Sequence, residues 1–264
     1  MDFSGRVALI TGGGNGIGRA AALGFARRGA RVMVVDRDAR GCEETVRLLR
    51  EAGAEAGHAV ADVTRAAEVR DYVAATMEAF GAIDCFFNNA GIEGRVAPLV
   101  DSDEENFDQV IAVNLKGVFL GLKHVLPVML RQGRGAVVNT ASTAAVQGSP
   151  GLSVYVASKH GVLGLTRTAA GEVARGGVRV NAVCPGPTAT RMIESLERQG
   201  GNDPEQVGRR YRDTIPLGRY TTAEEVAGVV LFLCSDLAGG VTGAHYLVDG
   251  GRTATSASVR TVGG

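Results

Sequence analysis

The sequence predicts an α/β protein with one doubly wound parallel sheet of about seven strands and helices on both faces. Short β-branched and aliphatic runs alternate with longer stretches in which apolar residues recur at helical spacing. Several of the short runs end in glycine or in polar residues, which is typical of buried strands that enter tight turns. No linker or internal repeat divides the 264 residues. We therefore expect a single domain over residues 1–251, with a polar substrate lid at about 188–216, and a C-terminal tail over 252–264.

Charge and hydropathy favour a cytoplasmic protein with a small-molecule partner. The chain has 28 basic and 28 acidic residues, so no basic excess indicates nucleic acid or an anionic membrane as a partner. The apolar runs, such as residues 226–234, are far shorter than the ~18 residues that span a bilayer. Asp2 lies where a signal peptide would be basic, and no apolar signal core follows it.

The cysteines and histidines predict neither a disulfide framework nor a metal site. They are dispersed, without a C-x-x-C pair or metal-ligand spacing, and they are Cys42, Cys85, Cys184, Cys234, His58, His124, His160 and His245. Such scattered thiols are typical of a reducing compartment.

The first strand, turn and helix carry a glycine-rich motif. We expect a strand over residues 6–11, a helix over 17–28 and a second strand over 31–36. Between the first two runs Thr11-Gly-Gly-Gly-Asn-Gly-Ile-Gly18, whose helix opens near Gly16, lets the backbone turn sharply and offers free N–H groups to a diphosphate. A plain loop would also explain these glycines. The complete βαβ unit, with an acidic residue eighteen positions after Gly18, favours dinucleotide binding.

Asp36 and Asp62 are candidate contacts to the adenosine half of a dinucleotide. Asp36 ends the second strand, where its carboxylate would accept hydrogen bonds from the ribose hydroxyls and repel a 2′-phosphate. This favours NAD over NADP, although the neighbouring Arg37 could turn toward a phosphate. Asp62 either reaches the adenine amino group or caps the helix that begins near Arg65.

Alternating elements continue to the end of the chain. Helices are expected over 43–51, 69–80, 103–130 and 223–233, and strands over 58–63, 83–87, 135–140, 178–184 and 244–248. Asn88-Asn-Ala-Gly91 and Ser142 directly follow strands, so they belong at the carboxyl edge of the sheet, where open α/β sheets bind ligands. The first of these segments would also suit a turn without a ligand. Asn114 interrupts an apolar helix face and is either a satisfied core amide or part of an active-site network.

Tyr155 and Lys159 are the candidate centre of the chemistry, since four residues on a helix place them one turn apart on one face. A phenol titrates near ~10, so action as a base near neutrality needs a pKa drop of roughly three units, or about 4 kcal/mol. One ammonium about 4 Å away supplies that amount at an effective dielectric of ~20. Tyr-x-x-x-Lys also occurs by chance on solvated helices, so the motif depends on its context.

Taken together, the chain resembles the short-chain dehydrogenases/reductases, from Val7 to Gly251. The matching motifs are specific only in this order and spacing, and they are Thr11-Gly-Gly-Gly-Asn-Gly-Ile-Gly18, Asp62, Asn88-Asn-Ala-Gly91, Asn114, Ser142, Tyr155-Val-Ala-Ser-Lys159, Pro185-Gly186 and Asp249-Gly-Gly251. The glycines depart from the common G-x-G-x-x-G spacing and follow the family's own G-x-x-x-G-x-G form. The resemblance implies a Rossmann-type sheet and hydride transfer between NAD(P) and an alcohol or ketone.

The resemblance also implies roles for individual residues. Tyr155 is the acid/base, Lys159 lowers its pKa and holds the nicotinamide ribose, Ser142 binds the substrate oxygen, and Asn114 supports a water relay. Asp36 and Arg37 lie at the adenosine ribose, while Asp62 and Val63 meet the adenine. Asn15, where NADP-preferring members often carry a basic residue, agrees with NAD. The other implied cofactor contacts are Gly12, Gly16, Ile17, Gly18, Asn89, Ala90, Gly91, Pro185, Gly186, Thr188 and Thr190.

The substrate is expected to be a small, uncharged, cyclic secondary alcohol or ketone. Residues 85–94 and 117–123 are similar to those of family members with such substrates, and the candidate pocket residues are mainly apolar: Ala144, Val146, Gln147, Leu152 and Met192. One alternative is a 3-oxoacyl-carrier-protein reductase using NADPH, against which Asp36 argues. The other is a catalytically silent NAD-binding regulator. The resemblance further implies a homo-oligomer, either a dimer or a tetramer.

Overall fold

The computed structural model describes residues 1–254 and contains one seven-stranded parallel sheet with the order β3-β2-β1-β4-β5-β6-β7. The predicted fold class is therefore confirmed. The strand order reverses between β1 and β4, which opens a crevice beyond the carboxyl ends of these strands. The strands are β1 (Val7–Thr11), β2 (Arg31–Asp36), β3 (Ala56–Val60), β4 (Cys85–Asn88), β5 (Gly135–Thr140), β6 (Val178–Pro185) and β7 (His245–Val248).

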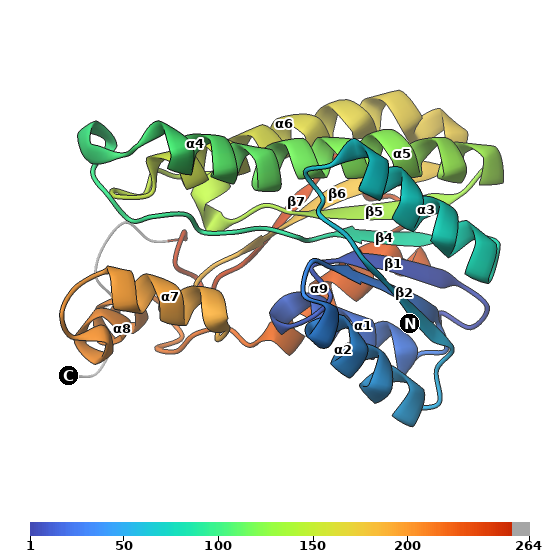
Figure 1. The fold of residues 1–264 in the computed structure, drawn as a ribbon, viewed down its shortest axis with the longest axis horizontal. Coiled ribbons are helices and arrows are strands. Elements are labelled where there is room, and N and C mark those ends of the chain that lie inside the picture. Colours follow the sequence, from blue (N-terminus) through green and yellow to red (C-terminus); the bar gives the residue numbers. More distant parts are fainter. Residues whose placement is uncertain (255–264) are drawn as a thin grey trace.

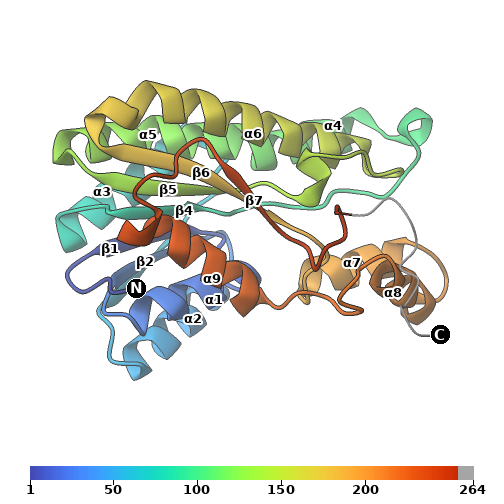
Figure 2. The ribbon, with the colours of Figure 1, turned by 180° about the vertical axis from the view of Figure 1, so that it is seen from behind.

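Helices cover both faces of the sheet (Figures 1 and 2). One face carries α1 (Gly16–Ala26), α2 (Ala39–Glu51) and α9 (Ala223–Cys234), and the other carries α3 (Ala66–Phe80), α5 (Gly117–Gln132) and α6 (Ser153–Val173). Two separate apolar clusters fill the space between each helix layer and the sheet. Because both faces are covered, the central strands are apolar throughout, and all five residues of β1 are buried.

Several predicted elements differ in their bounds from those in the structure. The second helix begins at Ala39 rather than at residue 43, and β3 ends at Val60, so that Asp62 lies beyond the strand. The predicted helix over 103–130 is divided into α4 (Glu104–Ile111), a π-helical turn (Ala112–Lys116) and α5. A π-turn inserts an extra residue without breaking the hydropathy pattern, so periodicity does not reveal it.

The helical run Glu104–Gln132 is also long and apolar enough to cross a membrane by composition alone. Its inward side chains, including Val118, Val125 and Met129, are buried in the apolar cluster beneath this helix layer. Burial against the sheet accounts for the apolar character of the run, as in the core helix of a globular protein.

The predicted lid folds into two short helices, α7 (Arg191–Gln199) and α8 (Pro204–Asp213). Both stand at the carboxyl end of the sheet, across from α4 (Figure 1). Neither apolar cluster includes a residue from α7 or α8. Of the predicted tail, Arg252 to Ala254 form a turn against Asp249, which accepts hydrogen bonds from the Thr253 backbone and hydroxyl. The remainder, 255–264, lies outside the described residues.

Candidate active site

The glycine-rich turn brings β1 and the start of α1 into unusually close contact. A Cβ atom at Gly18 would lie 2.1 Å from the Gly12 carbonyl oxygen, so no larger residue fits there. Gly12 and Gly16 have φ angles of 64° and 51°, which favour glycine. Asn15, the N-cap of α1, makes no capping hydrogen bond with its side chain. The first N–H groups of α1 therefore remain free to bind an anion at the end of the cavity formed by Gly12, Asn15 and Gly16.

Asp36 lies at the end of β2 with its carboxylate held toward the same turn. Its Oδ2 atom accepts a hydrogen bond from the Gly14 N–H at 3.0 Å, and Oδ1 accepts one from the Asp38 N–H at 3.1 Å. A carboxylate offers about four acceptor positions, so two remain open for hydroxyl groups. The exposed Arg37 lines the cavity beside it.

Asp62 and Val63 lie on the neighbouring wall of the cavity. Asp62 accepts a hydrogen bond from the Thr64 N–H at 2.9 Å and closes a local turn. The N-cap of α3 is Arg65, and no side chain caps this helix. The alternative in which Asp62 caps the helix is therefore wrong, and its second oxygen is available at the position predicted for an adenine contact.

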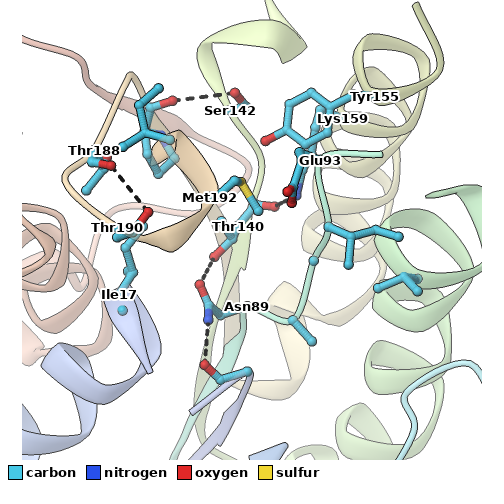
Figure 3. A pocket seen from close by; sticks show the side chains of 18 of the residues that line it. Ile17, Asn89, Glu93, Thr140, Ser142, Tyr155, Lys159, Thr188, Thr190 and Met192 are labelled. Atoms are coloured by element: carbon cyan, nitrogen blue, oxygen red, sulfur yellow. Dashed lines mark hydrogen bonds between the residues drawn. The ribbon is translucent and has the colours of Figure 1, made fainter. Parts of the chain in front are cut away.

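The two amides at the end of β4 lie at the carboxyl edge of the sheet and hydrogen-bond to neighbouring elements. Asn89 donates from Nδ2 to the Thr11 carbonyl at 3.1 Å and accepts from the Thr140 hydroxyl at 3.0 Å, joining β1 to β5 (Figure 3). Asn88 donates to the Val118 carbonyl at 3.0 Å and to Asn139 at 3.1 Å. Asn88 is thus bound inside the protein, whereas Asn89 and Ala90 also line the cavity.

Tyr155, Lys159 and Ser142 meet at the other end of the cavity, where α6 passes the ends of β5 and β6 (Figure 3). The Lys159 Nζ atom lies 5.6 Å from the centre of the Tyr155 ring and donates to the Thr140 carbonyl at 2.8 Å. Ser142 accepts a hydrogen bond from the Ala144 N–H at 3.1 Å, which orients its hydroxyl beside the phenol.

Burial dominates the electrostatics of this pair. It raises the pKa of Tyr155 to about 12, against the lowering effect of the Ser142 hydroxyl, and the negative charge of Glu93 raises it further. Burial also lowers the pKa of Lys159, which is 2% exposed, to about 8. In the chain alone the net direction for Tyr155 is therefore opposite to the lowering expected from Lys159. The reason is that burial of the phenol itself disfavours the charged phenolate.

Asn114 lies behind Gly91, on the side away from the cavity, in the π-helical turn, and is fully buried. Its Oδ1 atom accepts from the Ile92 N–H at 2.8 Å, and its Nδ2 atom donates to the Ile92 carbonyl at 2.9 Å and to Ser158 at 3.2 Å. A Cβ atom at Gly91 would lie 3.2 Å from Asn114 Oδ1 and 3.5 Å from Lys159 Nζ. The amide is therefore satisfied by Ile92 and Ser158, and its part in an active-site network stays a prediction.

The lid reaches the glycine-rich turn through Thr188 and Thr190. Thr188 hydrogen-bonds the Gly186 carbonyl and the Thr221 hydroxyl, each at 3.0 Å. Thr190 is the N-cap of α7, and its methyl group would lie 3.4 Å from a Cβ at Gly16. Thr190 therefore lies beside the start of α1 on the cavity wall.

One cavity of about 770 Å³ joins all these groups. Of the predicted cofactor and catalytic residues, only Gly18, packed inside the turn, and Asn114, behind Gly91, do not line it. Four of the five predicted pocket residues line it, whereas Val146 does not and is 40% exposed. The sequence prediction of a mainly apolar pocket is incomplete, because the wall also includes Gln109, Glu93, Arg191, Arg198, Tyr211 and Arg252.

The cavity fits a nicotinamide dinucleotide. One end of the cavity has the free N–H groups of α1 and a glycine surface that a Cβ would fill. The carboxylate of Asp36 lies at the ribose position and has open acceptor positions. The phenol of Tyr155 and the ammonium of Lys159 lie at the other end. These groups suit a diphosphate, a ribose and a reacting carbonyl or alcohol respectively.

Comparisons with known proteins agree with this architecture. Residues 12–253 match the family model described as enoyl-(acyl carrier protein) reductase. The chain is 46% identical to levodione reductase from Leifsonia aquatica, over 96% of each chain. It is 42% identical to cyclohexanol dehydrogenase from Acinetobacter sp. (strain SE19), over 95% of this chain and 96% of that one.

Solved structures give the same result. A crystal structure of levodione reductase has a TM-score of 0.94 at 45% identity and covers 96% of this chain and 99% of its own. NAD⁺-bound xylitol dehydrogenase has a TM-score of 0.91 at 36% identity and covers 95% of this chain and 100% of its own.

Proposed function

The chain belongs to the short-chain dehydrogenase/reductase family of oxidoreductases, and from this premise we propose that it interconverts small cyclic secondary alcohols and ketones with NAD(H). The observation that carries the proposal is the convergence of Tyr155, Lys159 and Ser142 on the cavity whose opposite end fits a dinucleotide. Levodione reductase and cyclohexanol dehydrogenase, both similar over most of this chain, are named for cyclic substrates.

The protein's own residues supply the proton chemistry and the positioning. A bound nicotinamide accepts or donates the hydride. In oxidation, the Tyr155 oxygen takes the proton of the substrate hydroxyl, while Ser142 donates a hydrogen bond to the same oxygen and stabilises its developing charge. In reduction, Tyr155 returns the proton. Lys159 uses one of its three donors on the Thr140 carbonyl, which leaves the others to hold a ribose hydroxyl.

Asp36 supports NAD rather than NADP as the cofactor. Its carboxylate lies at the cavity wall with two occupied and two open acceptor positions, and it would repel a 2′-phosphate. Arg37 is exposed, and its guanidinium is free to turn toward the 2′-phosphate of NADP, which would favour that cofactor instead. We expect kcat/KM with NAD to exceed that with NADP by about tenfold or more, the scale of one charged interaction.

The experiment that tests the proposal follows NADH absorbance with a panel of cyclic alcohols and ketones. Turnover of cyclohexanol or a substituted cyclohexanone with NAD(H), at least tenfold better than with NADP(H), supports it. Preference for a 3-oxoacyl thioester with NADPH would instead establish an acyl-carrier-protein reductase. Tight NADH binding without turnover across the panel would establish a catalytically silent regulator.

We further propose a cytoplasmic homo-oligomer. Phe107 on α4 and Phe119 and Leu130 on α5 are between 42% and 49% exposed, and Leu247 is 44% exposed on the edge strand β7. Edge strands and apolar helix faces of this kind are commonly covered by a second copy of the chain. Sedimentation equilibrium at micromolar concentration distinguishes a dimer or tetramer from a monomer.

A further inference from the structure

Glu93 brings an unpaired carboxylate to the substrate side of the active-site cavity. It lines the cavity together with Tyr155 and Leu152, and Figure 3 shows its side chain among those of the cavity wall. Within residues 1–254 the carboxylate makes no hydrogen bond or ion pair, since the nearby Arg95 pairs with Asp103 and Glu105 instead. Its negative charge raises the pKa of Tyr155.

The backbone that carries Glu93 is fixed on both sides. Ile92 forms two hydrogen bonds with the buried Asn114, at 2.8 and 2.9 Å. Gly94 has a φ of 75°, and the next N–H, that of Arg95, donates to Asn106 at 2.9 Å. These anchors fix the backbone position from which the Glu93 side chain extends, which suits a residue that sets specificity.

The chemistry of this carboxylate determines which substrates it favours. An ionised carboxylate only accepts hydrogen bonds, so its complement is a donor such as a hydroxyl, and a carbonyl oxygen or an anion at the same place is disfavoured. A substrate that expels water from Glu93 without donating a hydrogen bond leaves a charged group unsatisfied, which weakens binding.

Other charges on the cavity wall favour a neutral donor over a cationic one. Arg191, Arg198 and Arg252 line the same cavity, and the Arg252 guanidinium lies 6.0 Å from the centre of the Tyr211 ring. These guanidinium groups repel an ammonium group on a substrate, and Glu93 repels a carboxylate or phosphate group.

From these contacts we infer that Glu93 is a specificity-determining residue that binds a second hydroxyl group of the substrate, so that the enzyme prefers cyclic diols and hydroxyketones to simple cyclic alcohols. The inference rests on the proposed alcohol dehydrogenase function and names the substrate class of that same site. Neither neighbour of Glu93 carries a polar side chain that could make this contact, since they are Ile92 and Gly94.

The test compares the isomers of cyclohexanediol with cyclohexanol in the wild-type enzyme and in Glu93→Gln, with NAD and NADH detection. We expect wild-type kcat/KM for the best diol to exceed that for cyclohexanol by about tenfold or more, the scale of a hydrogen bond to a charged group. In Glu93→Gln this ratio falls about tenfold, mainly through the KM of the diol. Glu194→Gln is the matched control, because Glu194 is exposed on the lid helix α7 and does not line the cavity.

A second measurement keeps the inference independent of turnover. Raising the concentration of the diol in the presence of NADH is expected to raise the Tm of wild type and of Glu194→Gln more than that of Glu93→Gln. Equal diol-to-cyclohexanol ratios and equal Tm shifts in wild type and Glu93→Gln would overturn the inference while leaving the alcohol dehydrogenase function intact. A diol-dependent Tm shift that needs Glu93, without turnover of any alcohol, would overturn the proposed function and retain the binding site.

Discussion

At the level of single residues, the proposed chemistry depends on the hydroxyl of Tyr155. Tyr155→Phe keeps the ring that packs beside Lys159 and removes only the proton donor and acceptor. We expect kcat to fall by about three orders of magnitude or more, which is within the range of general acid–base catalysis combined with lost orientation. NADH affinity, measured by fluorescence titration, should stay within a few-fold. Turnover near the wild-type rate in this variant would disprove the assignment.

The raised pKa of Tyr155 gives the two reaction directions opposite pH dependence. Burial raises this pKa to about 12 in the chain alone, so Tyr155 is a phenol at neutral pH. Oxidation needs the phenolate, and its kcat/KM should therefore climb with pH through the alkaline range, by up to about tenfold per unit while the phenol predominates. Reduction needs the phenol and should stay constant below about pH 8, the pKa to which burial lowers Lys159. Initial rates in both directions between pH 6 and 10 check this, and an oxidation rate that falls with rising pH would contradict it.

At the level of secondary structure elements, the end of α7 is tied to the loop that carries Glu93. Gln199, the last residue of α7, accepts a hydrogen bond from the Val96 N–H at 3.0 Å, and its amide donates to the Gly94 carbonyl at 3.4 Å. These bonds connect the lid to the opposite wall of the cavity.

Gln199→Ala is therefore expected to loosen the lid without changing the chemistry. Loss of about 1 kcal/mol of hydrogen bonding corresponds to a rise in substrate KM of about fivefold, with kcat and NADH affinity nearly unchanged. Gln206→Ala on α8 is the control, because the exposed Gln206 pairs only with Arg210 along its own helix. Equal KM values for the two variants would show that the bonds of Gln199 do not control substrate binding.

The sequence predicts the elements and residues whose role follows from local chemistry. The glycine turn, the carboxylate of Asp36 and the spacing of Tyr155 and Lys159 are all readable from short segments, and the structure brings these residues to one cavity. Glu93 and Arg252 reach the same cavity only through the path of their loops. No periodicity or motif near them specifies that path, so the sequence analysis places Arg252 in the tail and does not include Glu93 in the pocket.

The pKa of Tyr155 also cannot be predicted from a short segment of sequence. The spacing of Tyr155 and Lys159 predicts an ammonium near a phenol, and the structure places the two groups together. The direction in which the pKa of Tyr155 shifts, however, depends on how much water remains around both groups. That quantity depends on β5, β6 and the lid packing over the site, and it is a property of the tertiary structure.

For the whole molecule, burial of the charged Lys159 lowers the free energy of unfolding. Burial lowers the pKa of Lys159 from 10.5 to about 8, so at pH 7 its charge destabilises the folded state. Lys159→Met should abolish activity and raise the free energy of unfolding by on the order of 2 kcal/mol, equivalent to several degrees in Tm for a chain of this size. Lys123→Met, which removes an exposed ammonium on α5, is the control and should change Tm little.

The sign of the pH dependence follows from proton binding. Between pH about 8 and 10.5 the unfolded chain holds a proton on Lys159 that the folded chain has released, so the stability of the wild type rises through this window. The Tm advantage of Lys159→Met over wild type should therefore shrink between pH 7 and pH 10. An advantage that grows with pH would show that burial does not lower the pKa of Lys159.

The position of α7 and α8 outside both apolar clusters has a practical result for protein engineering. Residues 191–213 can be exchanged for the corresponding segment of a related enzyme while the sheet and its two helix layers keep their own packing. Such a chimaera would take one wall of its substrate cavity from the donor segment, and it would keep the Glu93 contact and the thermal resistance of the recipient.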